Sequence, residues 1–284
     1  MKRFTKVTAL LLALLLLLSG CGAAQPAPTE APTEAPTEPP VVLDPVDDNY
    51  RTFYQVFVGS FSDSNNDGIG DIRGVINRLD YLNDGDMNTE TDLGVQGIWL
   101  SPIFKSPSYH KYDASNYYEI DWRFGTMEDL KELADLCEAR NIKLILDLAI
   151  NHTSKNHEWF LQFKEARING DTENPYYDYY SCATTEGKQN GVTYQKFAGV
   201  DCWYECNFST EMPELNFDNP EVRQAMLDVA KYYLDLGVDG FRFDAVKYIY
   251  YGDTARSVEF WEWYMEELRK IKPDIYCVGE CWSG

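Results

Sequence analysis

Short apolar runs alternate with longer amphipathic segments from about residue 50 to the end of the chain. The apolar runs are nearly continuous, which is typical of strands buried on both faces. The longer segments carry apolar residues at helical spacing. Strands are predicted at 52–61, 94–103, 143–150, 238–246 and 275–282, and helices at 126–141, 220–237 and 257–271. This alternation predicts an α/β fold with a parallel sheet covered by helices.

A long stretch without such periodicity separates the third and fourth predicted strands. It covers residues 153–215 and is rich in Tyr, Asn and Gly. Loops of this length are uncommon in compact domains unless they are functional. The stretch is therefore predicted to be functional or to form a small inserted domain.

The N-terminal residues follow a different pattern and are predicted to lie outside the fold. Lys2 and Arg3 precede an apolar run at 9–18 and the sequence LSGC at 18–21. This order indicates a secretory signal peptide over residues 1–20. The apolar run is too short for a comfortable membrane span. LSGC resembles a bacterial lipobox, which implies lipidation of Cys21; an ordinary signal peptide with an incidental cysteine is the alternative.

A linker is predicted to follow Cys21 and to extend to residue 45. Its main part, 25–40, contains three APTE units. Polar sequence rich in proline cannot bury a core and stays extended. We therefore expect a domain held at the bacterial cell surface, on the extracellular side, that contacts the membrane through its lipid anchor only.

Charge and cysteine content narrow the choice of partners. The formal net charge of −21 makes nucleic acid an unsuitable partner, because its phosphate backbone is negative as well. Six cysteines follow Cys21, and an exported chain can pair some of them. With only three histidines, no zinc site of four ligands stands out. The cysteines are predicted to be mostly free or partly paired.

Polar residues gather at the C-terminal ends of the predicted strands. They are Asp147, Asn151 and His152 on the third strand, Arg242 and Asp244 on the fourth, and Glu280 on the fifth. In a β/α barrel these ends form the catalytic face. Arg242 and Asp244 are two residues apart and share one face of their strand. A buried ion pair that satisfies itself is the alternative interpretation, but packing alone would not predict clustering at one end.

Asp244 and Glu280 are predicted to come from neighbouring strands, an arrangement that suits glycoside hydrolysis. One carboxylate attacks the sugar carbon, while the other protonates the leaving oxygen and then activates water. Arg242 is expected to keep Asp244 ionised. The apolar neighbours Cys277, Val278 and Trp282 are expected to help Glu280 retain its proton. In this interpretation His152 donates a hydrogen bond to a sugar hydroxyl, and Tyr112 stacks on a pyranose ring.

The chain resembles the α-amylase family of glycoside hydrolases from about residue 50 to its last residue. Four segments are similar to the family's ordered motifs: DLAINHTS (147–154), MPELNFDNP (212–220), GFRFDAVKY (240–248) and GECW (279–282). SPSYHKYDASNYYEID (106–121) resembles the loop that supplies a stacking tyrosine. The resemblance implies the first five strands of a (β/α)8 TIM barrel, with barrel parts at 46–152 and 216–284 and an inserted B domain at 153–215 after the third strand.

The resemblance also implies residue roles and a substrate. Asp244 would be the nucleophile and Glu280 the acid/base. Arg242, His152 and Tyr112 would line the subsite of the sugar being cleaved, and Lys247 would face the leaving group. The implied activity is retaining hydrolysis of α-1,4 bonds in starch-like glucans, and Ala245 after the nucleophile is similar to members that act on such bonds. Transfer to another sugar, trimming from chain ends and non-catalytic glucan binding are the alternatives.

The segment DSNNDGIGD, at 63–71, predicts a calcium site. Oxygen-bearing residues alternate there around two glycines, as at the start of an EF-hand loop. The twelfth position is Gly74 rather than Glu, so the loop is not an EF-hand. Similar loops after the first strand bind calcium in parts of the family. The ligands would be Asp63, Asn65, Asp67, the Ile69 carbonyl group and Asp71; a polar turn with Asx caps is the alternative.

The sequence departs from the family pattern in two ways. Tyr248 stands where the nucleophile motif commonly has histidine, which puts in doubt a second calcium site near Asn151. The sequence also stops at Gly284, before the region that would supply a third catalytic carboxylate. We therefore expect a fragment of a longer protein, and we expect that this fragment is inactive when it is expressed alone.

Overall fold

The computed structural model describes residues 47–86 and 88–282. The chain divides into two compact units, residues 1–42 and 43–284, and every described residue belongs to the second. The predicted signal peptide, Cys21 and the linker therefore lie outside the described residues.

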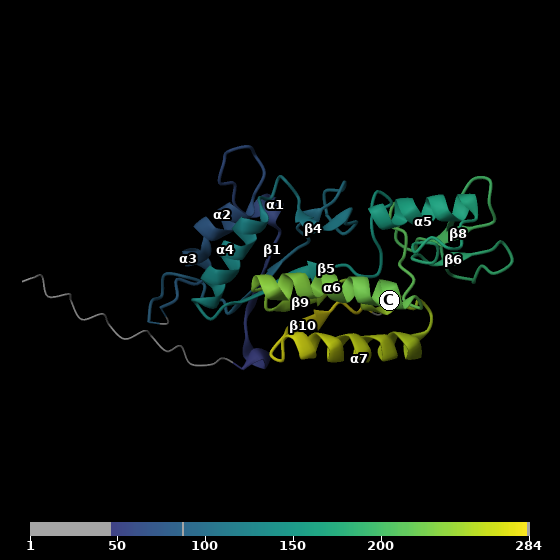
Figure 1. Cartoon of the computed structure of the whole chain (residues 1–284). Coiled ribbons are helices and arrows are strands. Elements are labelled where there is room, and N and C mark those ends of the chain that lie inside the picture. Colours follow the sequence, from purple (N-terminus) through teal and green to yellow (C-terminus); the bar gives the residue numbers. More distant parts are fainter. Residues whose placement is uncertain (1–46, 87, 283–284) are drawn as a thin grey trace, which may run out of the picture. The chain divides into compact units, whose positions relative to one another are not determined.

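A five-stranded parallel sheet forms the centre of the second unit (Figure 1). Its strands are β1 (Phe53–Val56), β2 (Gly97–Leu100), β5 (Lys143–Leu148), β9 (Gly240–Phe243) and β10 (Tyr276–Gly279), and they pair in this order. Each lies inside one of the five predicted strands, so the parallel sheet is confirmed. The order of pairing follows the chain, as expected for successive β/α units of a barrel.

Three long helices follow the predicted ranges closely. They are α4 (Met127–Glu138), α6 (Pro220–Leu236) and α7 (Thr254–Ile271), and Figure 1 shows α6 and α7 running beside the sheet. Capping side chains fix where they begin. Thr126 and Asp129 form a reciprocal capping box at α4, and Asn219 caps α6 by accepting from the N–H of Glu221.

The first predicted strand was too long. The strand ends at Val56, and Val58–Phe61 forms the short helix α1. The loop that follows packs tightly against this turn, because the Gly70 N–H donates to the Gly59 carbonyl oxygen at 2.9 Å. A Cβ atom at Gly70 would lie 2.1 Å from the Val58 oxygen, so only glycine permits the close approach. The short helices α2 (Ile72–Asn77) and α3 (Leu79–Leu82) come next.

The stretch between the third and fourth barrel strands has its own secondary structure. It contains α5 (Glu158–Asn169) and an antiparallel sheet of β6 (Cys182–Ala183), β8 (Trp203–Glu205) and β7 (Tyr194–Lys196), in that spatial order. A disulfide joins Cys182 to Cys202. Buried aromatic rings connect α5 to this sheet; they include Phe160, Phe163, Phe197 and Tyr204. The exact domain boundaries stay predictions.

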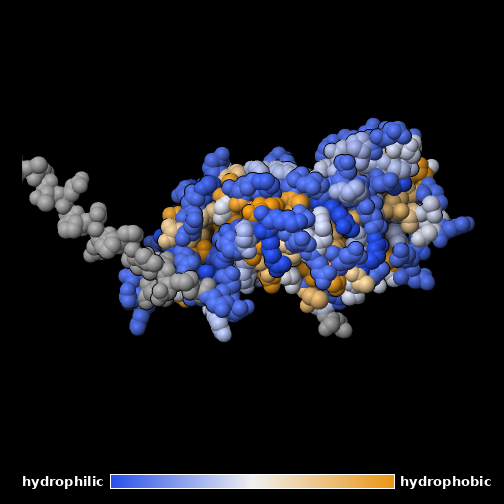
Figure 2. Space-filling view, turned by 60° about the horizontal axis from the view of Figure 1, so that its bottom comes forward, coloured by the Kyte–Doolittle hydropathy of each residue, from blue (hydrophilic) through white to orange (hydrophobic). Residues whose placement is uncertain are grey.

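A smaller antiparallel pair, β3 (Phe104–Lys105) and β4 (Asn116–Ile120), flanks the loop that carries Tyr112. Figure 2, which turns the α7 side of the molecule forward, shows hydrophobic surface between hydrophilic residues. Apolar side chains of β9, β10, α7 and the segment after β9 line a cavity of about 350 Å³; they include Phe243, Val246, Trp261 and Val278. Within residues 47–86 and 88–282, no helix is long and apolar enough to cross a membrane.

Candidate active site

One guanidinium group connects three carboxylates at the C-terminal ends of the barrel strands. The Nη1 atom of Arg242 lies 2.9 Å from the nearer oxygen of Asp147 and 2.8 Å from that of Asp244. The Nη2 atom of Arg242 lies 2.6 Å from the nearer oxygen of Glu280. The parallel register explains this convergence, since Arg242 lies opposite Asp147 on β5 and opposite Val278 on β10. The two interpretations of the GFRFDAV strand are therefore compatible: Arg242 is buried and ion-paired, and it lies among the predicted catalytic residues.

Asp147 is the carboxylate that sequence reasoning noticed but assigned no role. Its side chain is fully buried, and it accepts hydrogen bonds from the Tyr112 hydroxyl (3.1 Å) and the Trp99 indole N–H (3.2 Å) in addition to Arg242. Burial raises the pKa of Asp147 to about 7, although the charge of Arg242 acts in the opposite direction. The position of Asp147 at the end of the third predicted strand was visible in the sequence. The side chains that bind it there could not be predicted from the sequence.

Replacement of Asp147 by alanine is expected to destabilise the whole protein by about 3–5 kcal/mol. It removes one carboxylate partner of the buried Arg242 and the acceptor of the half-buried Tyr112 and Trp99 donors. The measurement is urea unfolding at pH 7. The matched control is Asp274→Ala, which removes an exposed carboxylate paired with Lys143 and Lys272 and should cost less than about 1 kcal/mol. Equal losses in the two variants would contradict this role of Asp147.

Asp244 and Glu280 differ in how far they are exposed. Asp244 is 9% exposed, whereas the Glu280 side chain is 39% exposed. Of the predicted apolar neighbours of Glu280, Val278 and Trp282 are exposed and Cys277 is half-buried. In the described sheet β10 is an edge strand, and the Glu280 side chain that follows it is more exposed than that of Asp244.

The backbone after Asp244 connects the two carboxylates. Ala245 adopts a left-handed conformation with φ of 48°, and its N–H lies 3.3 Å from the Oε2 atom of Glu280. The Glu280 N–H in turn donates to the Phe243 carbonyl oxygen at 2.9 Å. A non-glycine residue in this conformation costs free energy and commonly marks a functional position. The turn thus fixes the position of Glu280 relative to Asp244.

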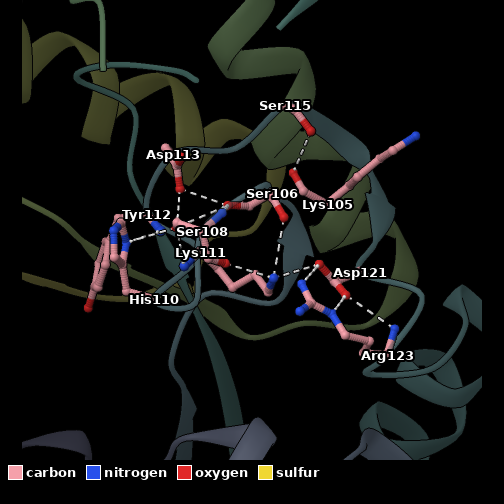
Figure 3. Close-up of polar contacts among 10 residues, drawn as sticks. All are labelled: Lys105, Ser106, Ser108, His110, Lys111, Tyr112, Asp113, Ser115, Asp121 and Arg123. Carbon is pink, nitrogen blue, oxygen red and sulfur yellow. Dashed lines mark hydrogen bonds and ion pairs between the residues drawn. The ribbon is translucent and has the colours of Figure 1, made fainter. Parts of the chain in front are cut away.

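A buried lysine fixes the loop that carries Tyr112 (Figure 3). The Nζ atom of Lys111 lies 2.7 Å from Asp121 and donates to the carbonyl oxygens of Ser106 and Ser108. Both side chains of this ion pair are almost fully buried, where a lost partner is costly. Tyr112 follows Lys111 directly and reaches Asp147 with its hydroxyl group. Its ring lies 5.8 Å from the Arg242 guanidinium. The structure therefore brings Tyr112 to the carboxylate cluster, as the resemblance implied.

The side chain of His152 is buried beneath the surface of the candidate site. It is 1% exposed, and its Nε2 atom has no hydrogen-bond partner among the described residues. Burial lowers the pKa of His152 to about 4, so the ring is neutral at pH 7. A neutral imidazole with a free Nε2 is available to bond a hydroxyl group. Lys247 donates to the Trp282 carbonyl oxygen at 2.6 Å. Its role at the leaving-group side stays a prediction.

The predicted calcium loop is held by its own backbone. Asp63 accepts from the N–H groups of Asn65, Asn66 and Gly68, and Asp71 caps α2 through the Gly74 N–H. The Gly68 N–H lowers the pKa of Asp63. These contacts are those of Asx turns, the alternative interpretation. Among the residues that the structure describes, no cluster of three or more His, Cys, Asp or Glu side chains is suited to a metal ion. Calcium therefore stays a proposal.

Comparison with known proteins decides the family. A family model described as "Alpha amylase, catalytic domain" matches residues 55–284. The chain belongs to the α-amylase family. Its relatives include Alpha-amylase 3 of Dictyoglomus thermophilum, with 43% identity over 78% of this chain and 42% of the relative. They also include an oligo-1,6-glucosidase of Bacillus cereus, with 40% identity over 69% of this chain and 35% of the relative.

A solved structure supports the same assignment. Amy13B of Eubacterium rectale is 41% identical, with a TM-score of 0.75 over 83% of this chain and 45% of that one. The family resemblance and the partial TIM barrel are thereby confirmed, and the relatives are glycosidases. The chain spans less than half the length of the curated relatives named here. Their names differ in activity, so the family alone leaves the specific reaction open.

Proposed function

We propose that the whole protein is a retaining hydrolase of α-1,4-glucosidic bonds in starch-like glucans. The observation that carries this proposal is the pair Asp244 and Glu280 on adjacent strands, both bound to Arg242. Asp244, buried beside the Arg242 cation, suits the nucleophile, and Glu280, from the adjacent strand, suits the group that protonates the leaving oxygen and activates water. The name of the D. thermophilum relative, Alpha-amylase 3, supports this choice of substrate.

A second reaction of the same site is transfer of the glycosyl group to another sugar or trimming from chain ends. One of the relatives is named an oligo-1,6-glucosidase, and this name supports a reaction other than hydrolysis of internal α-1,4 bonds as the second candidate. Both reactions use the same covalent step and differ in what accepts the sugar. A non-catalytic glucan-binding protein would have no need of the two carboxylates.

The test is hydrolysis of soluble starch by the whole protein. We expect cleavage at internal bonds, so that new reducing ends form along the whole polymer from the start of the reaction. We also expect NMR to show products of retained anomeric configuration. Products of inverted configuration would contradict the covalent intermediate on Asp244, because inverting enzymes use their second carboxylate to activate water instead. Oligosaccharides longer than the substrate would favour transfer, and binding of starch without turnover would favour a non-catalytic protein.

We propose that the loop 63–71 binds calcium through Asp63, Asn65, Asp67, Asp71 and the Ile69 carbonyl group. An ion that binds only the folded loop stabilises the folded protein by linkage. At a concentration of a hundred times its Kd, the free energy of unfolding increases by about 2.7 kcal/mol, and the melting temperature rises accordingly. Calcium is therefore expected to raise the melting temperature of the whole protein. Asp67→Ala should remove this gain, whereas Asp86→Ala, in an exposed turn, should keep it. Identical melting curves in calcium and in chelator would contradict the site.

We propose that the protein is lipid-anchored through Cys21 on the bacterial surface. The signal-like segment and the LSGC sequence support this proposal. The exported protein should partition into detergent, and Cys21→Ser should release it or leave it unprocessed. Unchanged partitioning of this variant would contradict the anchor.

A further inference from the structure

We propose that the buried ion pair between Lys111 and Asp121 is a positioning device for the reaction, which acts on the substrate through Tyr112. The inference rests on the proposed function and deepens it, because it adds two residues that act on turnover through another side chain. Tyr112 follows Lys111 directly and reaches Asp147 with its hydroxyl group at 3.1 Å. A displacement of this loop would therefore move Tyr112 relative to the candidate catalytic carboxylates.

Lys111 has a backbone conformation that glycine adopts more easily. Its φ is 67°, in the left-handed region, which costs free energy for a residue with a Cβ atom. Residues in such conformations gather at functional sites, and the surrounding contacts must hold them there. The Lys111 backbone N–H accordingly donates to the Ser108 hydroxyl group at 3.1 Å. The left-handed turn comes directly before Tyr112, so it decides the direction in which this residue leaves the loop.

The ammonium group of Lys111 has an oxygen partner for each of its three N–H groups (Figure 3). It lies 2.7 Å from Asp121, and it donates to the carbonyl oxygens of Ser108 at 2.9 Å and Ser106 at 3.3 Å. An ammonium group carries three donors, so this set of partners satisfies it fully. Only 1% of the Lys111 side chain is exposed. Since a buried cation without partners is costly, these three oxygens fix the loop from 106 to 111.

Asp121 gives the loop a rigid point of attachment. It follows β4, and its backbone N–H donates to the Ile103 carbonyl oxygen at 2.9 Å. Its carboxylate accepts from the Arg123 guanidinium at 2.8 and 3.0 Å in addition to Lys111. Burial acts to raise the pKa of Asp121, but the hydrogen bonds from Arg123 and Lys111 lower it to about 2. The carboxylate is therefore charged at neutral and mildly acidic pH, and the ion pair persists throughout that range.

The contacts of Lys111 are local to one loop. Among the described residues, its hydrogen-bond and ion-pair partners all lie between 106 and 121. That segment contains the loop between β3 and β4, which form a separate pair outside the five-stranded sheet. Loss of the ion pair should therefore loosen this loop and leave the barrel strands in place.

His110 holds Tyr112 from the other side of the left-handed turn. Its Nδ1 atom accepts from the Tyr112 backbone N–H at 3.1 Å, and the two rings lie 5.9 Å apart with an angle of 30° between their planes. Tyr112 is thus held at its backbone, its ring and its hydroxyl group. These contacts fix its orientation as long as the turn at Lys111 keeps its shape.

Small displacements of a residue that orients the substrate have large effects on turnover. Misplacement by about 1 Å costs on the order of a hundredfold in rate. Tyr112 is predicted to stack on the sugar whose bond is broken, so a shift of its ring changes how Asp244 meets the sugar carbon. The loss should appear mainly in kcat, because the other sugar units of a long substrate still bind.

The test is a double-mutant cycle between Lys111 and Tyr112 in the whole protein, with soluble starch as the substrate. Lys111→Met keeps the length of the side chain and removes its charge. It should lower kcat about ten- to a hundredfold, with a smaller change of KM. In the Tyr112→Ala protein the same substitution should change kcat less than about twofold, because no ring remains to be positioned. Equal losses in the two backgrounds would overturn the inference.

The matched control is Lys105→Met. Lys105 lies on β3 beside the same loop, but more than half of its side chain and of that of its partner Glu119 is exposed. This variant should leave kcat and KM unchanged. Asp121→Asn keeps the size of the side chain and should give a smaller loss than Lys111→Met, with the same dependence on Tyr112. Circular dichroism shows whether the variants fold. If neither Lys111→Met nor Asp121→Asn folds, the ion pair serves folding and the inference is overturned.

A spectroscopic measurement separates this inference from the proposed function. Fluorotyrosine is incorporated into the whole protein, and the fluorine NMR signal of Tyr112 is assigned by its absence in Tyr112→Phe. The signal should shift or broaden in Lys111→Met and stay in place in Lys105→Met. A shift without hydrolysis of starch by the unmodified protein would support the positioning of Tyr112 and refute the proposed function. An unchanged signal in Lys111→Met would overturn the inference even if starch is hydrolysed.

Discussion

Replacement of Asp244 by asparagine is expected to lower starch hydrolysis by the whole protein more than about 10³-fold, because an amide cannot form the covalent glycosyl intermediate. Asparagine keeps the shape of the side chain and an oxygen for Arg242 Nη1, which lies 2.8 Å from the carboxylate. The melting temperature should therefore change little while turnover disappears. The assay is release of reducing ends at saturating starch.

The matched control lies at the other end of the same barrel strand. Asp239 precedes β9, and one of its oxygens accepts from the Leu144 N–H at 2.9 Å, a bond that asparagine can keep. Asp239→Asn should retain most of the activity. Full activity of Asp244→Asn would refute its assignment as the nucleophile, and a loss of the same size in both variants would point to a structural effect.

Glu280→Gln is expected to lower hydrolysis of starch by about 10²- to 10⁴-fold, the usual contribution of general acid–base catalysis. An aryl glucoside with a good leaving group needs little proton donation, so its glycosylation step should be much less affected. Glutamine also removes the ion pair with Arg242 at 2.6 Å, but this side chain is 39% exposed and the stability cost should be small.

The Glu280→Gln variant is assessed by comparing its loss of activity on starch with its loss of activity on the aryl glucoside. A glucosyl intermediate should accumulate with the activated substrate, since the same residue activates water in the second step. Glu266→Gln, on the exposed face of α7, should behave as the unchanged protein does. An equal loss on both substrates would argue that Glu280 binds sugar or supports the fold rather than transfers a proton.

Local pattern was sufficient for the fold and for the candidate carboxylates. Each of the five strands contains a short apolar run, and their order of pairing follows the chain. Asp244 and Glu280 could be placed near each other because the C-terminal ends of parallel strands meet at one edge of the sheet. The start of α6 was predicted at residue 220, where Pro220 occupies the first helical position. These features depend only on neighbouring residues and on a fixed geometry.

The ends of strands were less predictable. The run 52–61 is mostly apolar, yet its second half is helical, where Gly59 and Gly70 bring two backbone segments into contact. The inserted stretch shows the same limit. Its disulfide joins Cys182 and Cys202, and nothing in the spacing of six cysteines distinguished this pair from the others.

The sequence by itself therefore determined the order of elements, the face on which the polar residues gather and the two carboxylates proposed for catalysis. Only the tertiary structure decided how those groups share their environment. The Arg242 guanidinium contacts three carboxylates, and Asp147 is buried among hydrogen-bond donors. The buried ion pair of Lys111 with Asp121 holds the loop that places Tyr112 in the site. The reason is physical: burial and distance across the sheet set these interactions, and both depend on residues far apart in the chain.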